Sequence, residues 1–236
     1  MEDELGVFQS LSEHSPLVVA GKTFTALTPT GDGHFLAGTV DGYMYQITKN
    51  ETGGWGAPAL FLGPPPSDVV PQVFAIEQSG DRIAVVYFTT RNFSQYGFIH
   101  VYENQAGGYT QIAARDFKYE VARISIDFDP TNNDRLLIGL QGIWDFIQDT
   151  MTEVSFPTFC YYAKFSPDGQ YVVMSASDWL SIYDTQHFLY WWWLAGEGPD
   201  ACVDVLQTVE NDTAVLKLIS AGSYGLIKKW NFIPPQ

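Results

Sequence analysis

The sequence predicts an all-β fold built from one repeated unit. Its clearest copy is residues 165–184, where the turn sequence Ser166-Pro167-Asp168-Gly169 precedes two short runs of strand-forming residues. Similar segments recur along the chain, and the 21 glycines and 13 prolines are scattered rather than clustered. Many short strands joined by many turns need this distribution, and 236 residues are enough to bury a sizeable core.

The unit recurs five times, each time as a strand, a turn and two further strands. The first strands begin near residues 24, 73, 122, 161 and 203, in steps of about 49, 49, 39 and 42 residues, against roughly 40–45 for one propeller blade. Insertions at residues 50–55, 63–71 and 89–96 lengthen the first two steps. A fourth strand is expected after each of the first four units, at residues 59–62, 109–113, 151–156 and 188–193. The recurrence predicts a β-propeller of five blades.

The third strands of the units end in related dipeptides. In order these are Ile47-Thr48, Tyr102-Glu103, Trp144-Asp145, Tyr183-Asp184 and Trp230-Asn231. The pattern resembles the WD40 repeat, which ends in Trp-Asp, and the resemblance covers about residues 16–232. It implies four-stranded blades whose first strands line a central channel.

The last unit is followed by no candidate for a fourth strand. In the WD40 family an N-terminal strand usually completes the last blade, so we expect residues 6–9 or 16–20 to pair there and close the ring. Residues 1–15 are therefore expected to form an N-terminal extension or closing strand, and residues 16–236 a single propeller domain. A fragment of a larger ring, or a half-ring completed by a partner, is the structural alternative.

The histidines depart from the WD40 pattern. A Gly-His dipeptide normally opens each repeat, and its histidine joins a hydrogen-bonded network. The four histidines here, His14, His34, His100 and His187, stand elsewhere in the repeats. Packing between blades is therefore expected to come from apolar and aromatic contacts.

Composition and charge narrow the classes of function. Hydrophobic residues make up 46% of the chain and aromatic residues 15%, which is too apolar for a disordered protein. A formal net charge of −15 disfavours nucleic acid and anionic membranes as partners. The acidic start is unlike a secretory signal, and the apolar run at residues 188–195 is too short to span a bilayer. We therefore expect an intracellular protein, in the cytoplasm rather than the nucleus. Cys160 and Cys202 are expected to be buried free thiols.

Residues with catalytic potential are restricted to carboxylates, because the sequence contains no spacing typical of a metal site, a nucleophile or a phosphate loop. No metal and no cofactor are therefore expected. Some five-bladed propellers are glycosidases with paired carboxylates at the channel, and the candidates here are Asp127, Asp129 and Asp204, with Glu77 behind them. Structural roles are expected instead: an ion pair of Asp127 with Arg123, a turn at Asp129, and a hydrogen bond between Asp204 and a neighbouring blade.

Aromatic side chains supply the candidate partner-binding residues. The run Tyr190, Trp191, Trp192 and Trp193 is expected on an outer strand, where it either packs between blades or forms an exposed anchor. Phe93 and Tyr96, in the insertion at residues 89–96, are the second choice.

Two functions from different classes remain. The first is a non-catalytic scaffold for protein–protein interaction, a subunit of a larger assembly, which predicts a large exposed apolar patch and a channel without convergent acids. The alternative is a carbohydrate-active propeller, either glycosidase or lectin, which predicts two or more carboxylates converging on the channel beside aromatic faces. We expect the first, and therefore no enzyme.

Overall fold

The computed structural model describes residues 19, 21–51, 55–67, 70–91, 94–117, 124–139, 141–154, 162–175, 179–186, 190–195, 202–210, 213–221 and 227–233. These residues form strands, turns and short connections, arranged in five antiparallel sheets. Within this described part, no helix has the length and apolarity needed to cross a membrane.

We number the sheets blade 1 to blade 5 in chain order. Blade 1 consists of β1 (Phe24–Pro29), β2 (Phe35–Thr39), β3 (Met44–Ile47) and β4 (Ala59–Leu62). Blade 2 consists of β5 (Gln72–Ser79), β6 (Arg82–Arg91), β7 (Ser94–Gln105) and β8 (Gly108–Phe117). Blade 3 consists of β9 (Ile126–Phe128), β10 (Arg135–Ile138), β11 (Gly142–Asp145) and β12 (Thr150–Glu153). Blade 4 consists of β13 (Tyr162–Phe165), β14 (Tyr171–Ser175), β15 (Trp179–Asp184) and β16 (Tyr190–Ala195). Blade 5 consists of β17 (Cys202–Glu210), β18 (Thr213–Ala221) and β19 (Ile227–Phe232).

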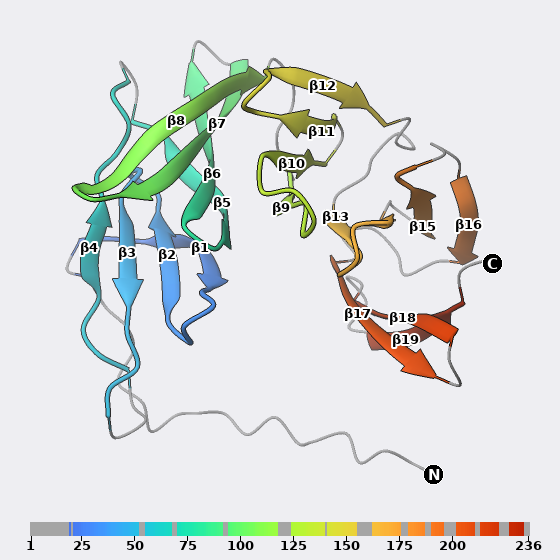
Figure 1. The fold of residues 1–236 in the computed structure, drawn as a ribbon. Helices are drawn as coiled ribbons and strands as arrows, with labels where there is room; N and C mark the ends of the chain where they lie inside the picture. Colours follow the sequence, from blue (N-terminus) through green and yellow to red (C-terminus); the bar gives the residue numbers. More distant parts are fainter. Residues whose placement is uncertain are drawn as a thin grey trace.

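Each blade is a simple meander in which every strand pairs with the next one in the chain. The blades follow one another around a centre, with β1, β5, β9, β13 and β17 innermost and β4, β8, β12 and β16 outermost (Figure 1). The fourth strands expected from the sequence are thus confirmed as β4, β8, β12 and β16. The five-sheet, all-β architecture is confirmed as well.

The turn between β13 and β14 shows how local sequence fixes both a strand reversal and a contact between blades. The N–H of Gly169 donates to the carbonyl of Ser166 at 2.8 Å, and Gly169 adopts a φ of 70° that disfavours other residues. A β-carbon on Gly169 would lie 2.8 Å from the side chain of Thr131 in blade 3. The glycine therefore permits the turn and lets blade 4 approach blade 3 closely.

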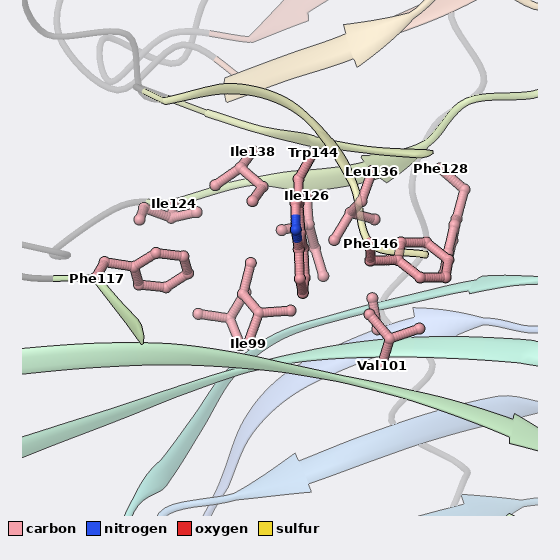
Figure 2. Packing of buried hydrophobic residues seen from close by; sticks show 12 residues of the cluster. Ile99, Val101, Phe117, Ile124, Ile126, Phe128, Leu136, Ile138, Trp144 and Phe146 are labelled. Atoms are coloured by element: carbon pink, nitrogen blue, oxygen red, sulfur yellow. The ribbon is translucent and has the colours of Figure 1, made fainter. Parts of the chain in front are cut away.

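The core lies between the blades. The largest described apolar cluster joins blade 2 to blade 3, and in Figure 2 the ring of Trp144 points from blade 3 toward Ile99 and Val101 of blade 2. Trp144 is almost fully buried, and its indole N–H donates to Asp149 Oδ1 at 3.1 Å. Similar clusters join blades 1 and 2, blades 3 and 4, and blades 4 and 5. Apolar and aromatic contact does provide the packing expected from the sequence.

Two expectations from the sequence are wrong. The described residues of the insertion at 89–96 form strand rather than loop, because residues 89–91 lengthen β6 and residues 94–96 lengthen β7, with Thr89 paired with Tyr96 and Arg91 with Ser94. β-branched and aromatic residues there continue the ladder of hydrogen bonds. Cys202 is exposed rather than buried, because it begins the inner strand of blade 5 beside the central cavity. Cys160 lies outside the described residues.

Packing of blade on blade runs in order from blade 1 to blade 5. Among the described strands, no comparable packing joins blade 5 back to blade 1. The expected closing strands, residues 6–9 and 16–20, lie outside the described residues except for Val19, which belongs to no strand. Closure by an N-terminal strand therefore stays a prediction.

Candidate functional site

The inner strands surround a central cavity of about 460 Å³. This volume is in the range of about 300–1,000 Å³ that small-molecule sites occupy. All five blades contribute to its wall, which is lined by Thr25, Phe74, Ala75, Ile76, Glu77, Ile124, Ser125, Ile126, Tyr162, Ala163, Lys164, Cys202 and Val203. Most of the wall is apolar, and Glu77 and Lys164 are its ionisable carboxyl and amine.

Four ionisable groups gather at this centre, one from each inner strand of blades 2 to 5. They are Glu77, Asp127, Lys164 and Asp204. Lys164 Nζ lies 3.4 Å from Asp204 Oδ1, across the junction of blades 4 and 5. Burial opposes the ammonium form of Lys164, but the surrounding carboxylates of Asp127, Asp204 and Glu77 outweigh burial and raise its pKa.

Glu77 has the most perturbed carboxyl of the described residues. Burial is the main cause, and the negative charge of Asp127 adds to it, so the pKa of Glu77 rises to about 7 against the opposing effect of Lys164. This carboxyl therefore changes its charge near neutral pH. The sequence placed Glu77 only behind the other candidates, because no local signal shows which charges a fold will bring together.

Asp127 links blade 3 to blade 4. Its Oδ2 accepts a hydrogen bond of 2.7 Å from the backbone N–H of Phe165, and two residues earlier Ser125 Oγ accepts one of 2.7 Å from the N–H of Ala163. Burial raises the pKa of Asp127 to about 6 despite this hydrogen bond and the charge of Lys164. Arg123, the expected partner of Asp127, lies outside the described residues.

Asp129 and Asp204 have the local roles expected for them. Asp129 Oδ1 accepts hydrogen bonds from the N–H and the hydroxyl of Thr131, at 2.9 and 2.7 Å, and its Oδ2 lies 3.0 Å from Arg135. This carboxylate is committed to the turn after β9. Asp204 is exposed and pairs with Lys164 of the neighbouring blade. The structure thus brings Glu77, Asp127 and Asp204 toward Lys164 and leaves Asp129 in the turn.

The aromatic partner-binding candidates lie on outer parts of blades 2 and 4. Tyr190, Trp191, Trp192 and Trp193 belong to β16, the outermost strand of blade 4, which pairs with β15. Their side chains are outside the described set, as is Phe93. Tyr96 lies in β7 on the lengthened hairpin and its side chain is exposed. Their role in binding stays a prediction.

One apolar surface was missed from the sequence. Val203, Leu216, Leu218 and Phe232 turn one face of blade 5 toward blade 4, so the alternate residues point the other way. This second face, which we call the outer face of blade 5, carries Leu206, Ile219, Ile227 and Ile233 at 60%, 46%, 62% and 62% exposure. A groove of about 200 Å³ on blade 5 is lined in part by Leu206 and Ile219. The signal in the sequence that could have revealed this surface is that the strands of blade 5 carry apolar residues on both faces.

Comparison with known proteins supports the architecture alone. No protein-family model matches the chain, and no curated protein matches it in sequence. Among solved structures, the Dos1 propeller matches with a TM-score of 0.55 and 13% identity, over 88% of this chain and 56% of that chain. The WD40 β-propeller domain of Doa1 matches with a TM-score of 0.54 and 10% identity, over 90% of this chain and 69% of that chain.

The chain has the WD40 β-propeller fold. The resemblance found in its terminal dipeptides is thereby confirmed at the level of fold. The propeller spans little more than half the length of the Dos1 propeller chain that it matches, and about two thirds of the Doa1 domain chain.

Proposed function

We propose that this WD40-type propeller is a non-catalytic scaffold for protein–protein interaction and a subunit of a larger assembly. The observation that carries this proposal is the outer face of blade 5. WD40 propellers offer rims and blade faces to other proteins, and fold alone does not decide which surface is used. The exposed apolar residues do point to one surface.

The outer face of blade 5 has the properties of an interface. Leu206 and Ile219 are diagonal neighbours on β17 and β18 and line the same groove, and exposed apolar neighbours of this kind mark sites of association. Ile227 and Ile233 lie near the two ends of β19, with Lys229 and Asn231 between them. Among the described residues of this face, the ionic groups are Asp204, Glu210, Lys217 and Lys229, two of each sign, whereas the whole chain carries −15. Lys217 Nζ lies 2.7 Å from Glu210 Oε1, so part of this charge is already paired. Electrostatic repulsion of a partner is thus smaller here than over the rest of an acidic protein.

The test compares assemblies formed by tagged protein in its own cells. The wild-type chain should elute from a sizing column in a complex well above its own 26.4 kDa, and the double variant Leu206→Asp/Ile219→Asp should elute free. Leu60→Asp and Ile147→Asp, at exposed residues of blades 1 and 3, are the matched controls and should stay in the complex. Elution of the wild type alone, or retention of the double variant, would contradict the proposal.

A second candidate function, the carbohydrate-active propeller, is supported by the gathering of Glu77, Asp127 and Asp204 with Phe74 and Tyr162 in the cavity wall. The scaffold hypothesis predicted a channel without convergent acids, so this feature favours the alternative. We rank it second because Asp127 accepts a backbone hydrogen bond and Asp204 is paired with Lys164, whereas hydrolysis needs an available acid and an available nucleophile or base. Incubation with a panel of aryl glycosides separates the two functions. Aryl release that is abolished by Glu77→Gln would favour the carbohydrate-active function.

A further inference from the structure

We propose that the central cavity binds an organic ammonium group, with Glu77 as its counter-ion. This inference concerns the central cavity, whose charged surroundings share Asp204 with the outer face of blade 5, and it goes beyond the scaffold function. It rests on the shape and lining of the cavity and on the arrangement of charges around it.

The balance of charge at the cavity favours a cation. Among the described residues, three carboxyl groups, those of Glu77, Asp127 and Asp204, act on the ammonium of Lys164. Lys164 forms its ion pair with Asp204, across blades 4 and 5. Within this described group of charges, a cation beside Glu77 would reduce the excess of negative charge once the carboxyls are ionised.

Glu77 is the carboxyl available to supply that interaction. Asp127 is engaged by the N–H of Phe165, and Asp204 by Lys164. Glu77 lines the cavity, and among the described residues its side-chain carboxyl takes part in no hydrogen bond or ion pair. A carboxyl that is largely withdrawn from water and has no such partner is stabilised when a ligand donates hydrogen bonds to it.

The wall of the cavity selects an organic cation over a bare metal ion. Among the described residues, no three His, Cys, Asp or Glu side chains lie close enough together to hold a metal. Phe74, Ile124 and Ile126 provide hydrocarbon surface for the carbon part of a ligand. The partly exposed ring of Tyr162 stands at the same wall, where an ammonium group over its face would gain a cation–π contact.

The ligand should bind in competition with a proton. The charged groups that act on Glu77 are Asp127 on β9, Lys164 on β13 and Asp204 on β17, and burial and these charges together bring its pKa to about 7. An ammonium ligand stabilises the ionised carboxyl and lowers that pKa on binding. Because the ionised fraction rises from roughly a tenth at pH 6 to roughly nine tenths at pH 8, affinity should rise about tenfold over this interval.

Titration calorimetry with two ammonium probes tests the site. Benzylammonium represents a free small amine, and N-acetyl-lysine methylamide represents a lysine side chain of a partner. At least one should bind with a Kd below about 1 mM at pH 8, and the tighter of the two identifies the source. Neutral benzyl alcohol is the matched probe for charge. The proposal would be overturned if benzyl alcohol bound as tightly as benzylammonium. It would also be overturned if neither amine bound at concentrations up to about ten times the expected Kd limit.

Matched variants locate the binding. Glu77→Gln should weaken the amine at least tenfold at pH 8 and remove the pH dependence. Glu153→Gln, the same change on the exposed outer strand of blade 3, should bind like the wild type. Unchanged affinity of a folded Glu77→Gln protein would refute the assignment. The scaffold proposal is tested by Leu206→Asp/Ile219→Asp in the assembly assay and this proposal by Glu77→Gln in the amine titration, so the failure of one is distinguishable from the failure of the other.

A measurement on the wild type does not depend on a folded variant. The carboxyl carbon of Glu77, followed by ¹³C NMR, should titrate near neutral pH in the free protein and at lower pH with saturating benzylammonium. A titration midpoint that does not move would also overturn the proposal.

Discussion

The backbone N–H of Phe165 in blade 4 donates a hydrogen bond of 2.7 Å to Oδ2 of Asp127 in blade 3. Similar bonds join side chains to the backbone of a neighbouring blade elsewhere on the inner strands, since Thr25 Oγ1 donates to the carbonyl of Val73 at 2.6 Å. These contacts join strands that belong to different sheets. They fix the spacing of the blades at the ring centre, where the cavity lies.

Replacing Asp127 should weaken the junction of blades 3 and 4. Asp127→Ala leaves the buried N–H of Phe165 without its acceptor, which should lower the free energy of unfolding by about 1–3 kcal/mol. Urea denaturation followed by tryptophan fluorescence measures this loss. Asp116→Ala, on the exposed side of β8, is the control and should change stability by less than about 0.5 kcal/mol. Equal effects of the two substitutions would contradict a specific role for Asp127.

Glu77 and Asp127 should each stabilise the protein less as the pH rises toward neutrality. The pKa of Glu77 is about 7 in the folded protein and that of Asp127 about 6, both above their ordinary values of 4.5 and 3.8. Between the ordinary and the folded pKa of each carboxyl, the folded state therefore binds more protons than the unfolded state. Each carboxyl stabilises the fold fully below its ordinary pKa, and this stabilisation is lost as the pH rises through the folded pKa.

Unfolding free energies at pH 4.5 and pH 7.5 check this dependence. Going from pH 4.5 to pH 7.5, the wild type should lose more stability than Glu77→Gln does, by about 3 kcal/mol at most, because the pKa of Glu77 is about 7 in the folded protein instead of 4.5. A Glu77→Gln variant with the full pH dependence of the wild type would disprove the assignment to Glu77.

Gly38 should be indispensable at the junction of blades 1 and 2. A β-carbon on Gly38 would lie 2.2 Å from the side chain of Val73, which is fully buried. Gly38→Ala should therefore force the blades apart and cost about 1–3 kcal/mol, as overpacking of a core does. Gly31→Ala, in an open turn with no atom within 4 Å of the added carbon, should leave the midpoint of thermal unfolding nearly unchanged.

The N-terminal residues should protect β19. If residues 6–9 or 16–20 supply the fourth strand of blade 5, as the sequence predicts, deleting residues 2–20 removes the hydrogen-bonding partner of β19. Hydrogen exchange at the amides of β19 should then accelerate by at least tenfold, whereas deletion of residues 234–236 should have little effect. Unchanged protection in the longer deletion would exclude this mode of closure.

The strands were predictable because their signals are local. Turn residues and alternating apolar residues placed β4 at residues 59–62 and β14 and β15 on either side of a short turn. The hairpin of β6 and β7 was misjudged because Thr89 and Tyr96 become strand residues only through pairing with each other. The local amino-acid composition does not indicate that these two residues pair.

The candidate site was predictable only in part. Placing the first strands of the blades at the centre put Asp127 and Asp204 on inner strands, where both act on Lys164, although the cavity wall itself includes neither. Lys164 was not recognised, because its importance comes from carboxylates that are distant in sequence. The outer face of blade 5 was not predicted for a related reason. When a strand is apolar on both faces, the neighbouring blade determines which face is covered.

Because the described packing runs from blade to blade in order, the described blades should behave as a linear array whose neighbours stabilise one another. The main packing of blade 5 among the described blades is against blade 4, so blade 5 should open before the interior blades do. A protein that binds the outer face of blade 5 would then act as a cap on the last blade. By stabilising blade 5, it would also slow the opening of blade 4. Binding of a partner to the outer face of blade 5 would then be detectable as slower local unfolding of blade 4.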